Sequence, residues 1–142
     1  MLAKFLVAVC MVIVAIFMIA TGARAEVFIT IDKSDQTMYV QTHTDAYEWP
    51  ISTGRRGYNT PTGKYRPYLL KKIHYSKKYD NAPMPWSIFF HGGYAIHATY
   101  DVNNLGSPAS HGCVRLGPRE AQWLYRLVKD EGSENTYIYI QD

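Results

Sequence analysis

The sequence predicts a mainly β fold, a sandwich or open barrel with one helix in its C-terminal half. Three observations lead to this class. Short apolar runs alternate with turn clusters along the chain, a single late segment has a helical apolar period, and no internal repeat or second domain is visible. The segments rich in β-branched and aromatic residues are 27–31, 37–41, 47–52, 64–70, 87–90, 94–97 and 136–140.

The first two of these runs are separated by a polar cluster, Asp-Lys-Ser-Asp-Gln at residues 32–36, and are therefore predicted to form a hairpin. The third run contains Pro50, which has no N–H group to donate to a neighbouring strand. We expect this strand to lie at a sheet edge or to break at the proline.

Residues 53–63 are rich in Gly, Pro, Asn and Thr and are predicted to be a long loop. Further on, Gly92 and Gly93 separate two apolar runs, and adjacent glycines supply the positive φ angles that a tight hairpin needs. This hairpin places His97 at the end of a strand, from which its side chain can project into a site.

One helix is predicted over residues 118–129. Pro118 suits the first helical position because its missing N–H has no intrahelical partner there in any case. Gly132 ends the helix. Its apolar face is formed by Ala121, Leu124, Tyr125 and Val128.

Residues 1–25 have the layout of a secretory signal peptide. Lys4 precedes an uninterrupted apolar run over residues 5–20, and Ala23-Arg24-Ala25 has the small-x-small form of a cleavage site. We therefore expect export to the periplasm or cell envelope, with residues 26–142 as the mature domain. An uncleaved N-terminal anchor is the alternative. Cys10 lies inside the apolar run and is not interpreted as a lipid attachment site.

Removal of Lys4 and Arg24 with that segment leaves a domain of nearly neutral net charge. Nucleic-acid-binding domains carry a strong basic excess, so this class is excluded. Residues 71–79 form a local basic segment with interleaved aromatic residues. A solvated loop is the plainest interpretation, and anionic groups of a cell envelope are the partners such a segment would attract.

The mature domain contains a single cysteine, Cys113, so no internal disulfide can form within it. A free thiol becomes a nucleophile when a base takes its proton, and a nearby imidazole is the usual base. His111 is too close in sequence to be that base, whereas His97 comes from a different strand. We interpret Cys113 as the nucleophile of an acyl transfer and His97 as its base and later acid. His97 would be oriented by a backbone carbonyl and would depress the pKa of Cys113.

The segment around the cysteine also supplies groups for a substrate. Gly112 lets the backbone approach a ligand closely, so the N–H groups of Gly112 and Cys113 are candidate donors to a developing oxyanion. Arg115 could pair with a substrate carboxylate or form a structural ion pair, and the sequence leaves both open. Ser110 alone would be interpreted as a turn residue.

The motif Ile96-His97-Ala98-Thr99, followed by Ser110-His111-Gly112-Cys113-Val114-Arg115-Leu116, resembles the signature of the L,D-transpeptidase catalytic domain, or YkuD domain. Ser52-Thr53-Gly54 and Thr60-Pro61-Thr62-Gly63-Lys64-Tyr65 resemble its other typical stretch. The resemblance extends over residues 27–141.

This resemblance implies a β-sandwich peptidoglycan L,D-transpeptidase that needs no cofactor and no metal. Cys113 would attack the carbonyl of the third residue of a tetrapeptide stem, with His97 as base. D-alanine would leave, and an amine of a second stem or of an envelope protein would resolve the thioester. His111, Gly112 and Cys113 would shape the oxyanion hole. The donor site would be lined by Ser110 and Arg115, although some members carry asparagine at the arginine position. The resemblance also implies that the protein has roles in cell wall biogenesis and cell shape.

Alternative functions remain open at this point. If water resolved the thioester, the enzyme would be an L,D-carboxypeptidase. A non-catalytic cell-wall-binding module would instead use an aromatic platform of Trp86, Tyr94 and Tyr100. A zinc site would draw its ligands from His91, His97, His111 and Cys113.

Overall fold

A computed structural model describes residues 22–142, so most of the predicted signal peptide, residues 1–21, lies outside the described residues. The described chain forms eleven strands, one α-helix and two short 3-10 helices. The strands are β1 (Val27–Asp32), β2 (Thr37–Gln41), β3 (Ala46–Pro50), β4 (Gly63–Tyr65), β5 (Leu69–Lys71), β6 (Tyr75–Ser76), β7 (Ala82–Pro83), β8 (Ser87–His91), β9 (Tyr94–Ala98), β10 (Val114–Leu116) and β11 (Thr136–Gln141). The helices are η1 (Val102–Asn104), α1 (Pro118–Glu131) and η2 (Ser133–Asn135).

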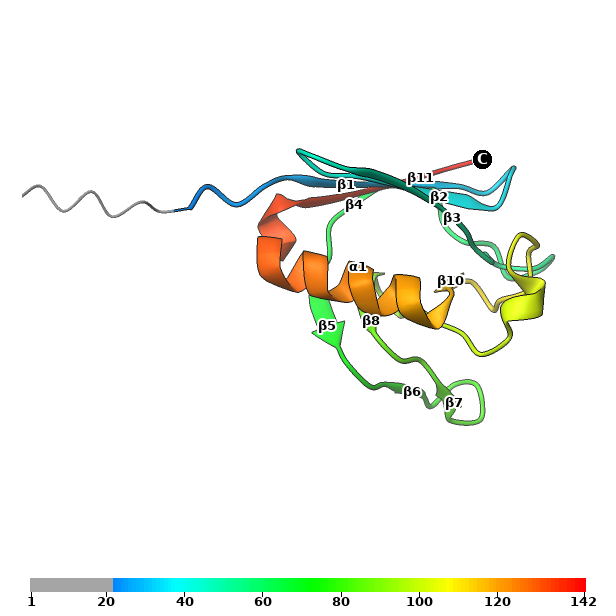
Figure 1. Cartoon of the computed structure of the whole chain (residues 1–142). Helices are drawn as coiled ribbons and strands as arrows, with labels where there is room; N and C mark the ends of the chain where they lie inside the picture. The colour runs from blue at the N-terminus through cyan, green and yellow to red at the C-terminus, as the bar shows by residue number, and fades with distance from the viewer. Residues whose placement is uncertain (1–21) are drawn as a thin grey trace, which may run out of the picture.

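The strands form two main sheets and one small hairpin. The five-stranded sheet has the order β3-β2-β1-β11-β4, and the four-stranded sheet has the order β10-β9-β8-β5. β6 and β7 pair only with each other and form an arm at the end of the molecule away from the five-stranded sheet (Figure 1). α1 packs against β8 and β9 of the four-stranded sheet. The expected mainly β architecture with one helix is confirmed.

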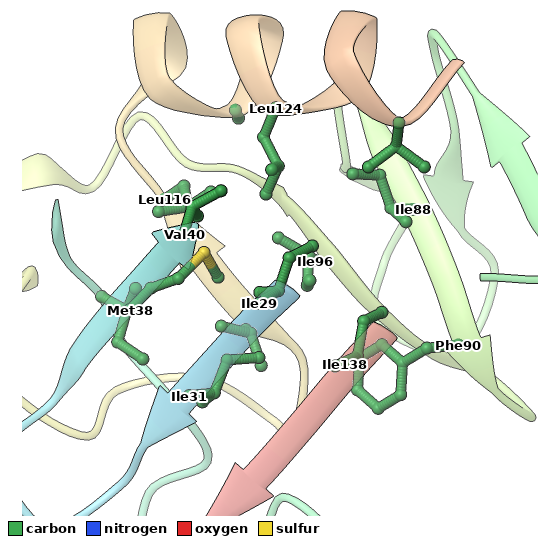
Figure 2. Packing of buried hydrophobic residues seen from close by; sticks show 14 of the residues in the cluster. Ile29, Ile31, Met38, Val40, Ile88, Phe90, Ile96, Leu116, Leu124 and Ile138 are labelled. Atoms are coloured by element: carbon green, nitrogen blue, oxygen red, sulfur yellow. The ribbon is translucent and has the colours of Figure 1, made fainter. Parts of the chain in front are cut away.

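The core lies between the two sheets and α1. Alternate side chains of β1, β2 and β11 point inward and meet side chains of β8, β9 and β10, while Leu124 of α1 points toward the same cluster (Figure 2). Burying each such aliphatic side chain contributes about 1.5–3 kcal/mol. The fully buried members include Ile29, Ile31, Met38, Val40, Ile88, Ile96, Leu116, Leu124 and Ile138.

Two predicted elements differ from the structure. The run 64–70 is divided between β4 and β5, which belong to different sheets, because Pro67 interrupts the strand between them. The helix runs two residues past its predicted end, to Glu131, and the N–H of Gly132 still bonds to the carbonyl of Val128. The strand with Pro50 lies at a sheet edge, as predicted.

The core begins at Val27. The residues before it make surface contacts only: Arg24 pairs with Glu134 at 2.9 Å, and the Ala25 N–H donates to Glu131 at 2.7 Å. Exposed pairs of this kind contribute little to stability. Residues 26–142 thus contain every described strand and helix and the entire described core. Within residues 22–142 no helix is long and apolar enough to cross a membrane.

Candidate active site

The two residues expected to perform chemistry sit on adjacent parallel strands. In the pairing of β9 with β10, His97 lies opposite Arg115, and Cys113 directly precedes β10. The pairing thus brings the turn that carries Cys113 beside the strand that carries His97. His97 and Cys113 both line a cavity of about 590 Å³, together with Ser110, His111 and Arg115.

His97 is held in one orientation and one tautomer. Its Nδ1 atom lies 2.7 Å from the carbonyl oxygen of Ala98, and a carbonyl can only accept. Nδ1 therefore carries the hydrogen, and Nε2 keeps a free lone pair. Only 6% of the residue is exposed. Burial lowers the pKa of His97 to about 4, helped by the positive charge of Arg115 and opposed by the Ala98 hydrogen bond. The ring is neutral at neutral pH.

The surroundings of Cys113 favour the protonated thiol, because its pKa is raised. Burial raises the pKa of the Cys113 thiol, while the Ala95 N–H and Arg115 oppose the rise. The sulfur lies 3.8 Å from the carbonyl oxygen of Gly93, at which a thiol hydrogen can point. The expectation of a depressed pKa is wrong, because a neutral His97 supplies no positive charge to stabilise a thiolate. The resting pair is a neutral thiol and a neutral imidazole.

The turn that carries the cysteine is tied by two hydroxyl groups. Ser110 Oγ donates to the carbonyl of Cys113 at 2.5 Å and accepts the N–H of Gly112 at 3.0 Å. Thr60 Oγ1 donates to the carbonyl of Gly112 at 2.7 Å and accepts the N–H of Gly54 at 2.9 Å. The sequence predicted no individual role for Thr60, although Thr60 belongs to the Thr-Pro-Thr-Gly stretch that resembles a family motif.

Gly112 has a φ of +118°, and a Cβ atom there would lie 2.7 Å from the ring of Tyr94, so only glycine fits. Its N–H already bonds to Ser110 and is not available to a ligand, contrary to the expectation. The N–H groups of His111 and Cys113 make no hydrogen bond to another residue of 22–142. These two groups are the free backbone donors of the turn.

His111 forms part of the cavity wall. Tyr79 stacks on its ring with centroids 4.1 Å apart, Tyr58 meets it edge-on at 4.8 Å, and Arg55 Nη2 lies 3.1 Å from Nε2. Because arginine can only donate, Nε2 accepts. Desolvation and the nearby cations Arg55, Arg115 and Lys78 lower the pKa of His111. The sequence did not predict that Tyr79, from the arm, would cover this histidine.

Arg115 forms an ion pair in this structure. Its Nη1 lies 3.9 Å from a carboxylate oxygen of Asp101 and 3.5 Å from the carbonyl of Ala109. Both members of the pair are partly exposed, at 22% and 47% of their side chains, so the pair is weak.

Within residues 22–142 the candidate residues form neither a metal site nor a joint aromatic platform. Within residues 22–142 no group of three His, Cys, Asp or Glu side chains is close enough to hold a metal ion, and His91 stacks with Tyr94 outside the cavity lining. Trp86 packs edge-on against Tyr125, while Tyr100 is 72% exposed and makes no ring contact within the described chain. The structure therefore forms no joint aromatic platform from the candidate residues.

Comparison with known proteins gives a consistent result. An L,D-transpeptidase from Mycobacterium smegmatis superposes with a TM-score of 0.73 at 22% identity, covering 83% of this chain and 59% of that one. An L,D-transpeptidase from Stackebrandtia nassauensis superposes with a TM-score of 0.70 at 25% identity, covering 82% of this chain and 56% of that one. L,D-transpeptidase 3 from Mycobacterium tuberculosis, solved with a faropenem-derived adduct, superposes with a TM-score of 0.72 at 21% identity, covering 83% of this chain and 61% of that one.

The chain thus spans about three fifths of the length of these solved structures. No curated protein sequence matches it. The sequence model of the YkuD family, the L,D-transpeptidase catalytic domain, matches residues 26–139, which is most of the chain. Together with the shared fold, this match shows that the chain belongs to the L,D-transpeptidase catalytic domain family.

Proposed function

We propose that this chain is a peptidoglycan L,D-transpeptidase in which Cys113 is the nucleophile and His97 acts first as general base and then as general acid. The observation that supports this most directly is the neutral pair in one cavity. The hydrogen bond to Ala98 leaves the Nε2 lone pair of His97 free, and Cys113 still carries the proton that this lone pair can take.

The acylation step follows from these states. As the Cys113 sulfur attacks the carbonyl carbon of the third stem residue, Nε2 of His97 takes the thiol proton, so no free thiolate has to persist in the buried site. The carbonyl oxygen becomes an oxyanion. The free N–H groups of His111 and Cys113 are its donors, and the hydroxyl groups of Ser110 and Thr60 hold the turn in the shape that directs them.

The intermediate then collapses. The imidazolium of His97 gives its proton to the nitrogen of the leaving D-alanine, and a thioester remains on Cys113. An amine of a second stem peptide, or of an envelope protein, attacks the thioester. His97 accepts a proton from that amine. It then gives this proton to the departing sulfur of Cys113, which restores the thiol. Attack by water instead would release the stem as an L,D-carboxypeptidase product.

Arg115 supplies recognition in this proposal. The peptide stem carries carboxylates, and a guanidinium binds a carboxylate with two parallel hydrogen bonds. The long, partly exposed contact with Asp101 is weak enough to be exchanged for a stem carboxylate at the cavity rim. We further propose that residues 1–25 export the enzyme to the periplasm or cell envelope, where it takes part in cell wall biogenesis.

Mass spectrometry of residues 26–142 after incubation with a carbapenem tests the nucleophile. A β-lactam is a suitable probe because the similar enzyme from M. tuberculosis has been solved with a faropenem-derived adduct. We expect one covalent adduct on the wild type and on His74→Gln, a cavity-lining control, and none on Cys113→Ala. A second assay measures D-alanine released from a tetrapeptide. An adduct that persists in Cys113→Ala would refute the assignment.

A further inference from the structure

The positive charges of the described chain are concentrated in one stretch. Residues 49–79 contain none of the twelve acidic residues of the protein. The same stretch contains the basic residues Arg55, Arg56, Lys64, Arg66, Lys71, Lys72, Lys77 and Lys78. The rest of the domain is therefore acidic in balance, and the near-neutral net charge hides a strong asymmetry.

The densest part of this stretch leads into the arm. Lys71 and Lys72 precede β6, and Lys77 and Lys78 follow it, and all four residues are exposed. Between the two lysine pairs lie two large apolar residues that are also exposed, Ile73 at 63% and Tyr75 at 55%. We call these six residues the arm surface.

The exposed apolar residues Ile73 and Tyr75 lie outside the cavity that their neighbours line. His74 packs edge-on against Phe89. His74 and Ser76 both line the cavity. Since successive side chains of a strand point to opposite sides, Tyr75 of β6 points away from the cavity. Ile73 lies in the bend before β6 and is also outside the cavity lining. Neither is needed to cover the core, because neither belongs to a buried cluster of the described chain.

From this arrangement we propose that the arm surface binds an anionic phospholipid membrane. Lysines attract the negative surface of such a membrane, and their apolar stems let the ammonium groups reach the headgroup phosphates. Ile73 and Tyr75 enter the boundary between headgroups and acyl chains, where an aromatic ring with a polar tip is favoured. A soluble anionic polymer would use the lysines alone and offers no apolar phase to Ile73.

The shape of the molecule suits this orientation. The arm stands at the end of the molecule away from the five-stranded sheet, so a flat surface can reach it (Figure 1). The arm also forms one wall of the cavity through Lys77, Lys78 and Tyr79. Ile73 and Tyr75 lie outside the cavity lining, so this inference does not depend on the proposed chemistry.

Co-sedimentation of residues 26–142 with vesicles tests the proposal. Omitting residues 1–25 removes the apolar N-terminal run, which would bind lipid by itself, and leaves the complete core. We expect binding to phosphatidylcholine vesicles that contain phosphatidylglycerol and none to pure phosphatidylcholine. Salt at about 1 M shortens the Debye length to about 3 Å and should weaken the binding strongly.

Two paired variants separate the contributions. Lys71→Glu/Lys72→Glu should weaken binding about 30-fold or more, since each lysine near an anionic surface contributes close to a factor of five. Arg119→Glu/Arg126→Glu makes the same charge change on exposed residues of α1 and should bind nearly as wild type. Equal losses in the two double variants would mean that net charge alone drives the binding and would overturn the proposal.

Ile73→Ser/Tyr75→Ser tests the apolar part without touching the core. We expect at least a tenfold loss of vesicle binding, with unchanged binding to the soluble anion polyphosphate. Unchanged vesicle binding in this variant, together with tight polyphosphate binding by the wild type, would overturn the membrane proposal in favour of an anionic polymer. Equal binding of the wild type to both vesicle compositions, or to neither, would also overturn it.

Discussion

Lowering the pH from about 7.5 to about 5 should destabilise the fold by roughly 2 kcal/mol through His97 alone. A histidine in the unfolded chain has a pKa of 6.5, whereas burial holds the pKa of His97 at about 4. Between these values the unfolded chain binds more protons than the folded one, so stability falls as the pH falls. Integration over this window gives roughly 2 kcal/mol at pH 5 and roughly 3 kcal/mol below pH 4.

Urea unfolding followed by tryptophan fluorescence measures this loss, with wild type and His97→Gln compared at both pH values. The variant has no titrating group at this position, whereas all other ionisable groups are common to both proteins. His74 and His111, whose pKa values are also lowered, therefore cancel in the comparison. We expect the free energy of unfolding of His97→Gln to fall by about 2 kcal/mol less than that of the wild type.

An equal fall in both proteins would refute the reasoning, because it would mean that His97 titrates in the fold as it does in the unfolded chain. A larger fall in the variant would imply that His97 is already protonated in the fold at neutral pH. A thiolate of Cys113 would then be its partner, and the neutral resting pair would be wrong.

Three further predictions concern the site. Alkylation of Cys113 should speed up with pH around a midpoint above that of an exposed cysteine, since burial raises the thiol pKa; a rate already at its plateau near pH 7 would contradict this. Thr60→Val should lower the free energy of unfolding in urea by about 1–3 kcal/mol, because it leaves the buried carbonyl of Gly112 unpaired; a change below about 0.5 kcal/mol would count against the network. Gly54→Ala should cost more than about 3 kcal/mol in the same assay, because its Cβ would lie 1.6 Å from a backbone oxygen. Gly93→Ala, which meets nothing within 4 Å, is the matched control and should be nearly neutral.

Much of the fold could be predicted from local patterns. The hairpin of β1 with β2, the edge position of the strand that contains Pro50, and the helix that begins at Pro118 all follow from rules that act within a few residues. The division of residues 64–70 between two sheets was not predicted, because the two short strands differ in their distant partners. β4 pairs with β11 and β5 pairs with β8. Pairing over such separations is set by how the whole core packs.

The candidate site, like the fold, could be predicted only in part from the sequence. The residue types alone identified Cys113 and His97 as a possible nucleophile and base, since a lone thiol and a strand-end imidazole are the chemically competent groups of the domain. Their protonation states could not be predicted, because a pKa depends on burial and on neighbouring charges, which are properties of the packed molecule. The sequence suggested a thiolate, and the tertiary structure supports a neutral pair.

Contacts between distant segments were likewise decided only by the tertiary structure. Thr60 reaches the carbonyl of Gly112, and Tyr79 stacks on His111, although both pairs are far apart in the chain. The sequence by itself determined which groups can react, where the turns fall and which faces are apolar. The packing of the two sheets and the arm determined how those groups are held, because hydrogen-bond geometry and desolvation arise only when distant segments meet.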